Sequence, residues 1–311
     1  MQEVEISRLV SPYRDDMVIK GYQFGHGEKA ACIVGPVRGN EIQQMYICSQ
    51  LVRTLKELEN NGCVSAGKQI MVIPYVNSHA INVERQFFGV KGVDINRNFP
   101  GNDYGEPVSR LAGKLLDEIK DYTYGIQFTS FYQRGEFVPH VRMMETGFQN
   151  TSLANLFGLP YVVVKHPLPI DTTTLNYNWQ DDNTCAFTLF TNCNDSIDET
   201  SARQAIAAVL RFLKRMGIIR YESHSGYISH VIYEQDMTEV YTNNSGLFRG
   251  KVKCGDDVRY GMEMAEIIDP ADGSVKEIIT APTDGIVFFA HSSALASQYD
   301  IAYRLIHRLH E

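Results

Sequence analysis

The sequence predicts an α/β domain followed by a small all-β domain, and three patterns carry this prediction. Up to about residue 220, short apolar runs alternate with longer amphipathic stretches, as in a sheet covered by helices. Beyond that point, strand-like runs alternate with glycine-rich turns, which indicates an all-β unit. A length of 311 residues, 44% of them hydrophobic, suffices for two cores. We expect domains at 1–222 and 223–311, with the linker near 221–227.

Five segments are the expected strands of the first domain. Each is short, apolar and rich in β-branched or aromatic residues. They lie at residues 29–35, 70–76, 122–131, 159–167 and 185–191.

Three stretches show the periodicity of amphipathic helices. Apolar residues recur at helical spacing over residues 41–58 and again over residues 108–120. The third stretch, residues 196–217, begins with capping and acidic residues and ends with two basic residues and a glycine. Charges placed in this way favour a helix because they complement its dipole.

The expected β-domain consists of short runs divided by turn sequences such as Asn-Asn-Ser-Gly and Pro-Ala-Asp-Gly. Its Pro-Thr-Asp-Gly turn is similar to that of biotinyl and lipoyl carriers. No lysine lies at a carrier-type hairpin tip, and we interpret Lys276 as a solvated charge. The domain is therefore expected to act as a lid, a docking surface or an oligomer contact.

Composition narrows the classes of partner. A formal net charge of -8 argues against nucleic acid, which requires a basic surface. No apolar run is long enough to cross a bilayer, and the polar, acidic first ten residues do not read as a secretory signal. The six cysteines form no CxxC pair and are expected to be reduced thiols. Together these features predict a cytoplasmic protein.

Polar motifs follow the first two strands. The first strand leads into Gly-Pro-Val-Arg-Gly-Asn-Glu at residues 35–41. The second leads to Asn77, then Arg85, and then to Asp-Ile-Asn-Arg-Asn-Phe-Pro-Gly at residues 94–101. An arginine followed by DxNRxFPG resembles the substrate-binding signature of the zinc carboxypeptidase-like superfamily. The most similar group is the succinylglutamate desuccinylase/aspartoacylase family.

This resemblance extends over nearly the whole chain, including the turn pattern of the β-domain. It implies a zinc-carboxypeptidase-like α/β/α sandwich with a mixed sheet, followed by a barrel-sandwich β-domain. It also implies a zinc ion held by an HxxE turn and by the histidine of a D-L-H segment, with a fourth position open for water. A glutamate in a T-x-E-x-G segment would accept a proton from that water. An arginine would polarise the scissile carbonyl, and Asn-Arg would bind the substrate carboxylate.

This chain departs from the pattern at three positions. The HxxE turn has Arg38 in place of its histidine and retains only Glu41. The D-L-H segment aligns with residues 125–127, which puts Gln127 at the third ligand. The T-x-E-x-G segment puts Phe190 at the catalytic carboxylate. Arginine has no lone pair for a metal, a glutamine amide is a poor zinc ligand and phenylalanine cannot transfer protons. We therefore expect a degenerate, metal-free and non-catalytic member without a cofactor.

Arg85, Asn96 and Arg97 keep the family positions that contact substrate. Arg38 and Glu41 are spaced to form an ion pair in the volume of the metal. The alternative is a solvated pair that helps the following helix to start. An arginine-rich pocket would accept a small acidic metabolite or a peptide carboxylate. The residues expected to bind this ligand are Arg38, Glu41, Arg85, Asn96, Arg97 and Gln127.

Two other functions remain open from the sequence. One is an active amidohydrolase or carboxypeptidase with a non-standard metal site, which would contain zinc. The other is a structural assembly protein that forms a homo-oligomer.

Several further side chains have both a functional and a structural interpretation. His140 is expected in a pocket wall or loop. Tyr177 and Trp179 either line a substrate pocket or pack in the core. Lone histidines near strand ends are expected to be structural rather than metal ligands. These are His26, His79 and His166.

Overall fold

Two units make up the chain, and the second includes a short segment from the middle of the sequence. The computed structural model describes residues 1–11, 15–83, 85–89, 92–131 and 134–307. The first unit comprises residues 1–130 and 139–232, and the second comprises residues 131–138 and 233–311. Sequence patterns gave no sign that residues 131–138 leave the first unit.

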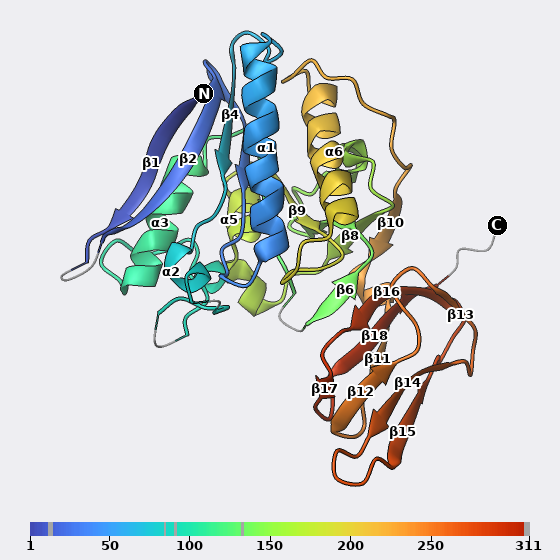
Figure 1. Cartoon of the computed structure of the whole chain (residues 1–311). Coiled ribbons are helices and arrows are strands. Elements are labelled where there is room, and N and C mark those ends of the chain that lie inside the picture. Colours follow the sequence, from blue (N-terminus) through green and yellow to red (C-terminus); the bar gives the residue numbers. More distant parts are fainter. Residues whose placement is uncertain (12–14, 84, 90–91, 132–133, 308–311) are drawn as a thin grey trace. The chain divides into compact units, whose positions relative to one another are not determined.

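A nine-stranded mixed sheet forms the centre of the first unit, in the order β1-β2-β4-β3-β5-β9-β7-β8-β10 (Figure 1). The strands β4, β3, β5 and β9 are parallel, whereas β2 pairs antiparallel with β4 and β7 pairs antiparallel with β9. The predicted α/β fold with a mixed sheet is therefore confirmed. The strand bounds are β1 (Gln2–Leu9), β2 (Met17–Gly25), β3 (Glu28–Val34), β4 (Lys68–Ile73), β5 (Tyr124–Phe128), β7 (His140–Met144), β8 (Tyr161–Lys165), β9 (Cys185–Phe190) and β10 (His230–Tyr233).

All five expected strands are present, but the sequence did not reveal the β1–β2 hairpin at the sheet edge. β1 buries only two consecutive residues, Ile6 and Ser7. A register shift between Glu5 and Ser7 places both of them inside, which breaks the alternation that would indicate a half-buried strand.

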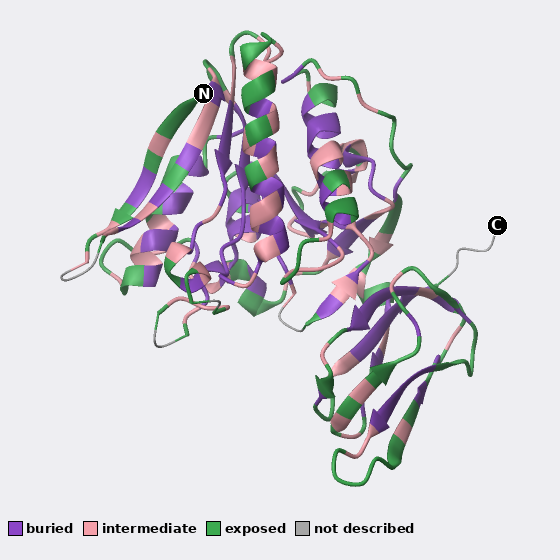
Figure 2. Cartoon of the chain, in the orientation of Figure 1, coloured by how far each residue is buried: buried purple, intermediate pink, exposed green. Residues whose placement is uncertain are grey.

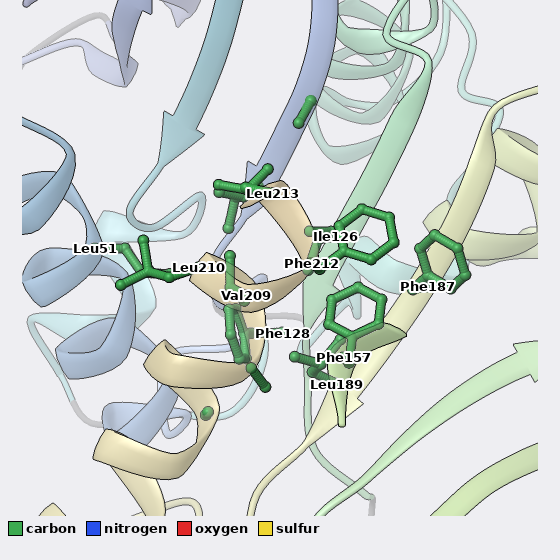
Figure 3. Close-up of a cluster of buried hydrophobic side chains, with 14 of the residues drawn as sticks. Leu51, Ile126, Phe128, Phe157, Phe187, Leu189, Val209, Leu210, Phe212 and Leu213 are labelled. Carbon is green, nitrogen blue, oxygen red and sulfur yellow. The ribbon is translucent and has the colours of Figure 1, made fainter. Parts of the chain in front are cut away.

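Helices α1 (Ile42–Asn60) and α6 (Glu199–Arg215) lie together over one face of the sheet (Figure 1). Both match predicted stretches. Aromatic and aliphatic side chains from β5, β9 and the two helices meet beneath them (Figure 3). The two helices turn buried residues to the sheet and leave exposed ones outside (Figure 2). Asp198 caps α6 by accepting hydrogen bonds from the backbone N–H groups of Thr200 and Ser201.

The opposite face is covered by α3 (Pro107–Ile119), which was predicted, and by α5 (Leu175–Asp181), which was not. Seven residues are too few for a clear helical period. Shorter helical turns complete the first unit: α2 (Ser78–Ile81), η1 (Ile95–Arg97), α4 (Thr151–Ala154), η2 (Asn155–Phe157) and η3 (Pro169–Thr173).

The second unit is all-β and contains two sheets with their own core. One sheet has the order β11-β18-β16-β13, with β6 paired to β16, and the other has the order β15-β14-β12-β17. The strands are β6 (Gly135–Phe137), β11 (Thr238–Tyr241), β12 (Gly246–Gly250), β13 (Asp257–Val258), β14 (Glu263–Ile268), β15 (Val275–Thr280), β16 (Gly285–His291), β17 (Leu295–Ala296) and β18 (Ile301–Ile306), with one short turn, η4 (Glu234–Asp236).

A helix that crosses a bilayer must be long and predominantly apolar. No helix in the described ranges combines the length and the apolar character that a bilayer crossing needs. All six cysteines are free thiols.

The aromatic cluster under α6 gives a test of the core. Phe212 is fully buried and stacks on Phe157 with ring centroids 4.2 Å apart. We expect Phe212→Ala to lower the free energy of unfolding by roughly 3–5 kcal/mol, because it removes buried area and leaves a cavity. Urea denaturation measures this loss. The matched change at exposed Phe148 should cost less than about 0.5 kcal/mol, and equal losses would contradict the assigned core.

Candidate functional site

The candidate site begins where β3 ends. The next strand in the sequence, β4, lies on one side of β3, and the following one, β5, lies on its other side. The order in which strands are added to the sheet therefore reverses at β3. In open α/β sheets, a crevice outside the carboxyl ends of the strands forms at such a switch point. Gly39, in the following loop, packs against the next loop so closely that a Cβ there would lie 2.3 Å from the Arg85 carbonyl oxygen. This close approach requires glycine and fixes the position of Arg38.

Arg38 is buried between two carboxylates. Its Nη2 lies 2.9 Å from Asp94 Oδ2 and its Nη1 lies 3.4 Å from Glu41 Oε1. Nη1 also donates to the Ser130 carbonyl oxygen at 2.9 Å. All three charged side chains are less than one-tenth exposed. The expected Arg38–Glu41 ion pair is therefore present, and it is buried rather than solvated.

Glu41 accepts further hydrogen bonds from the end of β5. Its Oε1 receives the Ser130 backbone N–H at 2.8 Å, the Ser130 hydroxyl at 2.6 Å and the Thr129 hydroxyl at 3.1 Å. The Arg38 backbone N–H donates to Oε2 at 3.2 Å. Both carboxylate oxygens are thus engaged by donors from the protein.

Thr129, and not Gln127, contacts the retained ligand position Glu41. Gln127 instead donates from Nε2 to Asn96 Oδ1 at 3.2 Å, and the same oxygen accepts the Leu175 backbone N–H at 3.1 Å. Asn96 therefore ties β5 to the start of α5. Thr129, two residues beyond Gln127, is therefore the residue of this segment whose side chain lies beside Glu41.

Phe190 lies at the end of β9 and is buried against its cross-strand neighbour His140. The two rings stack with centroids 4.8 Å apart and an interplanar angle of 4°. The Arg142 guanidinium carbon lies 4.3 Å from the centre of the Phe190 ring. His140 is thus a buried residue of strand β7 rather than a loop residue, and Phe190 offers no group that can transfer a proton.

A basic group surrounds the buried Asp171 carboxylate. Lys165 Nζ lies 2.8 Å from Oδ2 and Arg97 Nη1 lies 3.4 Å from Oδ1. Arg97 also donates to the Ile170 carbonyl oxygen at 2.8 Å. Burial raises the pKa of Asp171, but the Lys165 hydrogen bond, the Leu168 backbone N–H and the charges of Lys165 and Arg142 outweigh it and lower the pKa.

Three cations and one carboxylate leave this group of four residues with a positive excess. The group comprises Arg97, Arg142, Lys165 and Asp171, and we call it the Asp171 group. Sequence analysis selected only Arg97 from it. Arg142 lies two residues after His140 in the sequence and was not among the selected ligand-binding residues. Lys165 and Asp171 carry no local signal, because only folding brings them beside Arg97.

Arg85 reaches the site by its backbone rather than by its side chain. Its carbonyl lies against Gly39, and its side chain is exposed. Within the described ranges, that side chain makes no hydrogen bond or ion pair. Arg85 therefore contributes nothing to the Arg38 network, by which we mean Arg38, Glu41, Asp94, Thr129 and Ser130.

The other aromatic and histidine candidates are mostly structural. Trp179 is fully buried, packs against Gly125 and donates to the Ile119 carbonyl oxygen at 3.1 Å, so it is a core residue and the pocket-lining interpretation is wrong. Tyr177 is partly buried. His79 stacks on Phe88, and His166 pairs with Glu145.

The donors around Glu41 do not fit a zinc ion. Of the three converging positions, one is a permanent cation, one is a carboxylate already satisfied by donors, and one is a neutral hydroxyl that donates to that carboxylate. Zinc needs three lone-pair ligands. Across the described ranges, no group of three histidine, cysteine, aspartate or glutamate side chains is arranged to hold a metal.

Comparison with known proteins agrees with this fold. Residues 28–216, more than half of the chain, match the family described as succinylglutamate desuccinylase/aspartoacylase catalytic domain. The protein therefore belongs to the succinylglutamate desuccinylase/aspartoacylase family, as the sequence motifs predicted. No curated protein matches the chain.

Several solved structures share the fold. A succinylglutamate desuccinylase/aspartoacylase from Rhodobacter sphaeroides has a TM-score of 0.79 at 21% identity, with 94% of this chain and 89% of that chain covered. A succinylglutamate desuccinylase from Silicibacter sp. TM1040 has a TM-score of 0.82 at 18% identity, with 98% and 94% covered. The product-bound ectoine utilization protein EutE from Ruegeria pomeroyi has a TM-score of 0.79 at 18% identity, with 93% and 89% covered.

The lowered pKa of Asp171 predicts a pH-dependent contribution to stability. A depressed folded-state pKa stabilises the fold above the ordinary carboxyl value of 3.8, and this contribution is lost as the pH falls through the lowered value. We expect Asp171→Asn to cost about 1–3 kcal/mol at pH 7, where it removes charged hydrogen bonds. The difference from wild type should shrink below about pH 4.

Thermal unfolding at pH 7 and pH 3 measures this effect. The control is Asp103→Asn, at an exposed position whose side chain has no hydrogen-bond or ion-pair partner among the described residues. A destabilisation by Asp171→Asn that is as large at pH 3 as at pH 7 would show that the carboxylate charge is not its cause.

Proposed function

We propose that this protein is a non-hydrolytic member of its family, in which a buried arginine takes the place of the metal and a small carboxylate ligand is bound without cleavage. One observation carries the proposal: the Arg38 guanidinium is paired with both Glu41 and Asp94. An arginine stays protonated in a protein, so a divalent cation at Glu41 would meet a fixed positive charge.

The lack of a proton-transfer group supports the same conclusion. Hydrolysis in this class needs a polarised water and a nearby carboxylate. At the corresponding position, Phe190 is buried against His140. Thr129 and Ser130 hydroxyls donate to Glu41, which leaves this carboxylate as an ion-pair partner rather than a base.

The Asp171 group provides the positive charge that a carboxylate ligand needs. Arg38 cannot supply it, because two carboxylates surround a single guanidinium. Arg97 keeps the family position for substrate carboxylate and is partly exposed, at 21%. Arg85, which also keeps a family position, has an exposed side chain that a bound carboxylate can engage. The name of the family points to acylated amino acids as the ligand class.

The six free cysteines favour a cytoplasmic location for this ligand-binding protein.

Metal content gives the first test. Protein purified without chelators or a histidine tag is expected to contain far less than one zinc per chain, measured by mass spectrometry of the metals. The double variant Arg38→His/Thr129→His should bind zinc near stoichiometrically, because two imidazoles then converge with Glu41.

The matched control is Arg38→His/Gln127→His, which should not bind zinc, because Gln127 contacts Asn96 instead of Glu41. Wild-type protein that carries about one zinc per chain and hydrolyses an N-acylated aspartate or N-succinylated glutamate would refute the proposal.

Ligand binding gives the second test. Calorimetry with N-acylated aspartates, N-succinylated glutamate and dipeptides should detect binding to the wild type without product formation. Arg97→Gln should weaken binding by roughly tenfold or more, because a charge-assisted hydrogen bond contributes about 1.5–3 kcal/mol. Arg53→Gln, an exposed change on α1, should leave affinity unchanged.

A screen with no heat for either wild type or Arg97→Gln would contradict carboxylate binding. The same result together with a large, stable oligomer would favour the structural assembly role.

A further inference from the structure

A polar cavity lies in the first unit, between the end of β1 and α3. Its volume is about 150 Å³. Its polar lining consists of Ser7, Arg8, Arg110 and Lys114, and the remaining lining is apolar. None of these residues belongs to the Arg38 network or to the Asp171 group.

Two positive side chains, one arginine and one lysine, lie on one face of α3 and indicate an anionic ligand. Arg110 and Lys114 are four residues apart, so their side chains are neighbours on the helix surface. Among the described residues, neither side chain has a hydrogen-bond or ion-pair partner, and Arg110 Nε is buried without one. Like charges at this spacing destabilise a helix, and an unsatisfied buried donor costs about 1–3 kcal/mol. A bound anion removes both penalties.

Ser7 supplies the second, independent observation. The serine is 5% exposed, and its hydroxyl oxygen has no hydrogen-bond partner in the described part of the chain. The bulge in β1, where Glu5 pairs with Lys20 and Ser7 with Ile19, is what turns Ser7 inward beside Ile6. Buried hydroxyls almost always have a partner, so this one indicates a ligand that completes its hydrogen bonding.

Arg8 forms a fixed wall of the cavity rather than its source of charge. Its Nε donates to Glu5 Oε1 at 2.9 Å and its Nη1 to Asp16 Oδ2 at 3.0 Å. The cavity lining carries three cations, Arg8, Arg110 and Lys114. Glu5 and Asp16 supply two negative charges beside Arg8, so one positive charge remains in excess. A small cavity with excess positive charge and a buried hydroxyl selects a compact anion.

We propose that this cavity binds the phosphate group of a small phosphorylated metabolite, at a site separate from the proposed carboxylate site. A guanidinium, an ammonium and a hydroxyl supply donors from three side chains, which suits the three terminal oxygens of a phosphate monoester. A carboxylate has only two oxygens to receive them. The cavity holds a phosphate group, and the rest of such a ligand extends into solvent.

Calorimetry of the full chain with inorganic phosphate, at constant ionic strength with chloride as the reference salt, tests this site. We expect one phosphate per chain, and weaker binding of acetate. Arg110→Gln and Lys114→Gln should each weaken phosphate binding by about tenfold, and Ser7→Ala should weaken it several-fold. Lys56→Gln removes the same charge from an exposed position on α1 and should have no effect.

The variant Arg97→Gln separates the two proposed sites. It should weaken carboxylate binding by roughly tenfold or more and leave phosphate binding unchanged. Phosphate affinity that is the same in wild type, Arg110→Gln and Lys114→Gln overturns the proposal, as does a loss of phosphate binding in Arg97→Gln, which would place the phosphate at the Asp171 group. Acetate binding as tight as phosphate, lost in Arg110→Gln, would replace the phosphate by a carboxylate and also overturn it. Thermal unfolding of each variant without phosphate confirms that it is folded.

Discussion

The buried positive charge of Arg38 is the constraint on which the site depends. A guanidinium cannot be buried alone, because the loss of hydration costs several kcal/mol unless opposite charges and hydrogen bonds replace it. Glu41, Asp94 and the Ser130 carbonyl provide this replacement. The loop after β3, the Asp-Ile-Asn-Arg turn and the end of β5 must therefore meet at one point. The switch point of the sheet, and the glycine beside Arg38, make that meeting possible.

A metal ion and an arginine can both neutralise a carboxylate, but their chemistry differs. Zinc keeps an open coordination position for water, whereas a guanidinium is a donor without vacant orbitals. In the proposed function, the family scaffold therefore keeps its shape after such an exchange but loses the means to activate water. The two regions also differ in charge: Arg38 lies between two carboxylates, whereas Arg97, Arg142 and Lys165 gather around the single carboxylate of Asp171. In the proposed function, an anionic ligand is attracted to the second region.

Much of the fold could be predicted because its central strands and long helices have strong local patterns. Apolar runs such as residues 29–35 indicate strands buried on both faces, and the α1 and α6 stretches have clear helical periods. The β1–β2 hairpin and α5 escaped prediction, since a bulged edge strand and a seven-residue helix have no clear period. Residues 131–138 belong to the second unit because β6 pairs with β16, and these two strands lie far apart in the sequence.

The sequence by itself determined the family, and it predicted that Arg38 and Glu41 can pair, because these are matters of residue identity and short spacing. Only the tertiary structure decided that Asp94 is the second counter-ion, that Thr129 rather than Gln127 lies against Glu41, and that the cationic group gathers around Asp171. The physical reason is that electrostatic and hydrogen-bond partners are selected by distance in space. Asp94 lies 56 positions from Arg38 and Thr129 lies 88 positions from Glu41, so only the folded chain brings these partners within hydrogen-bond distance.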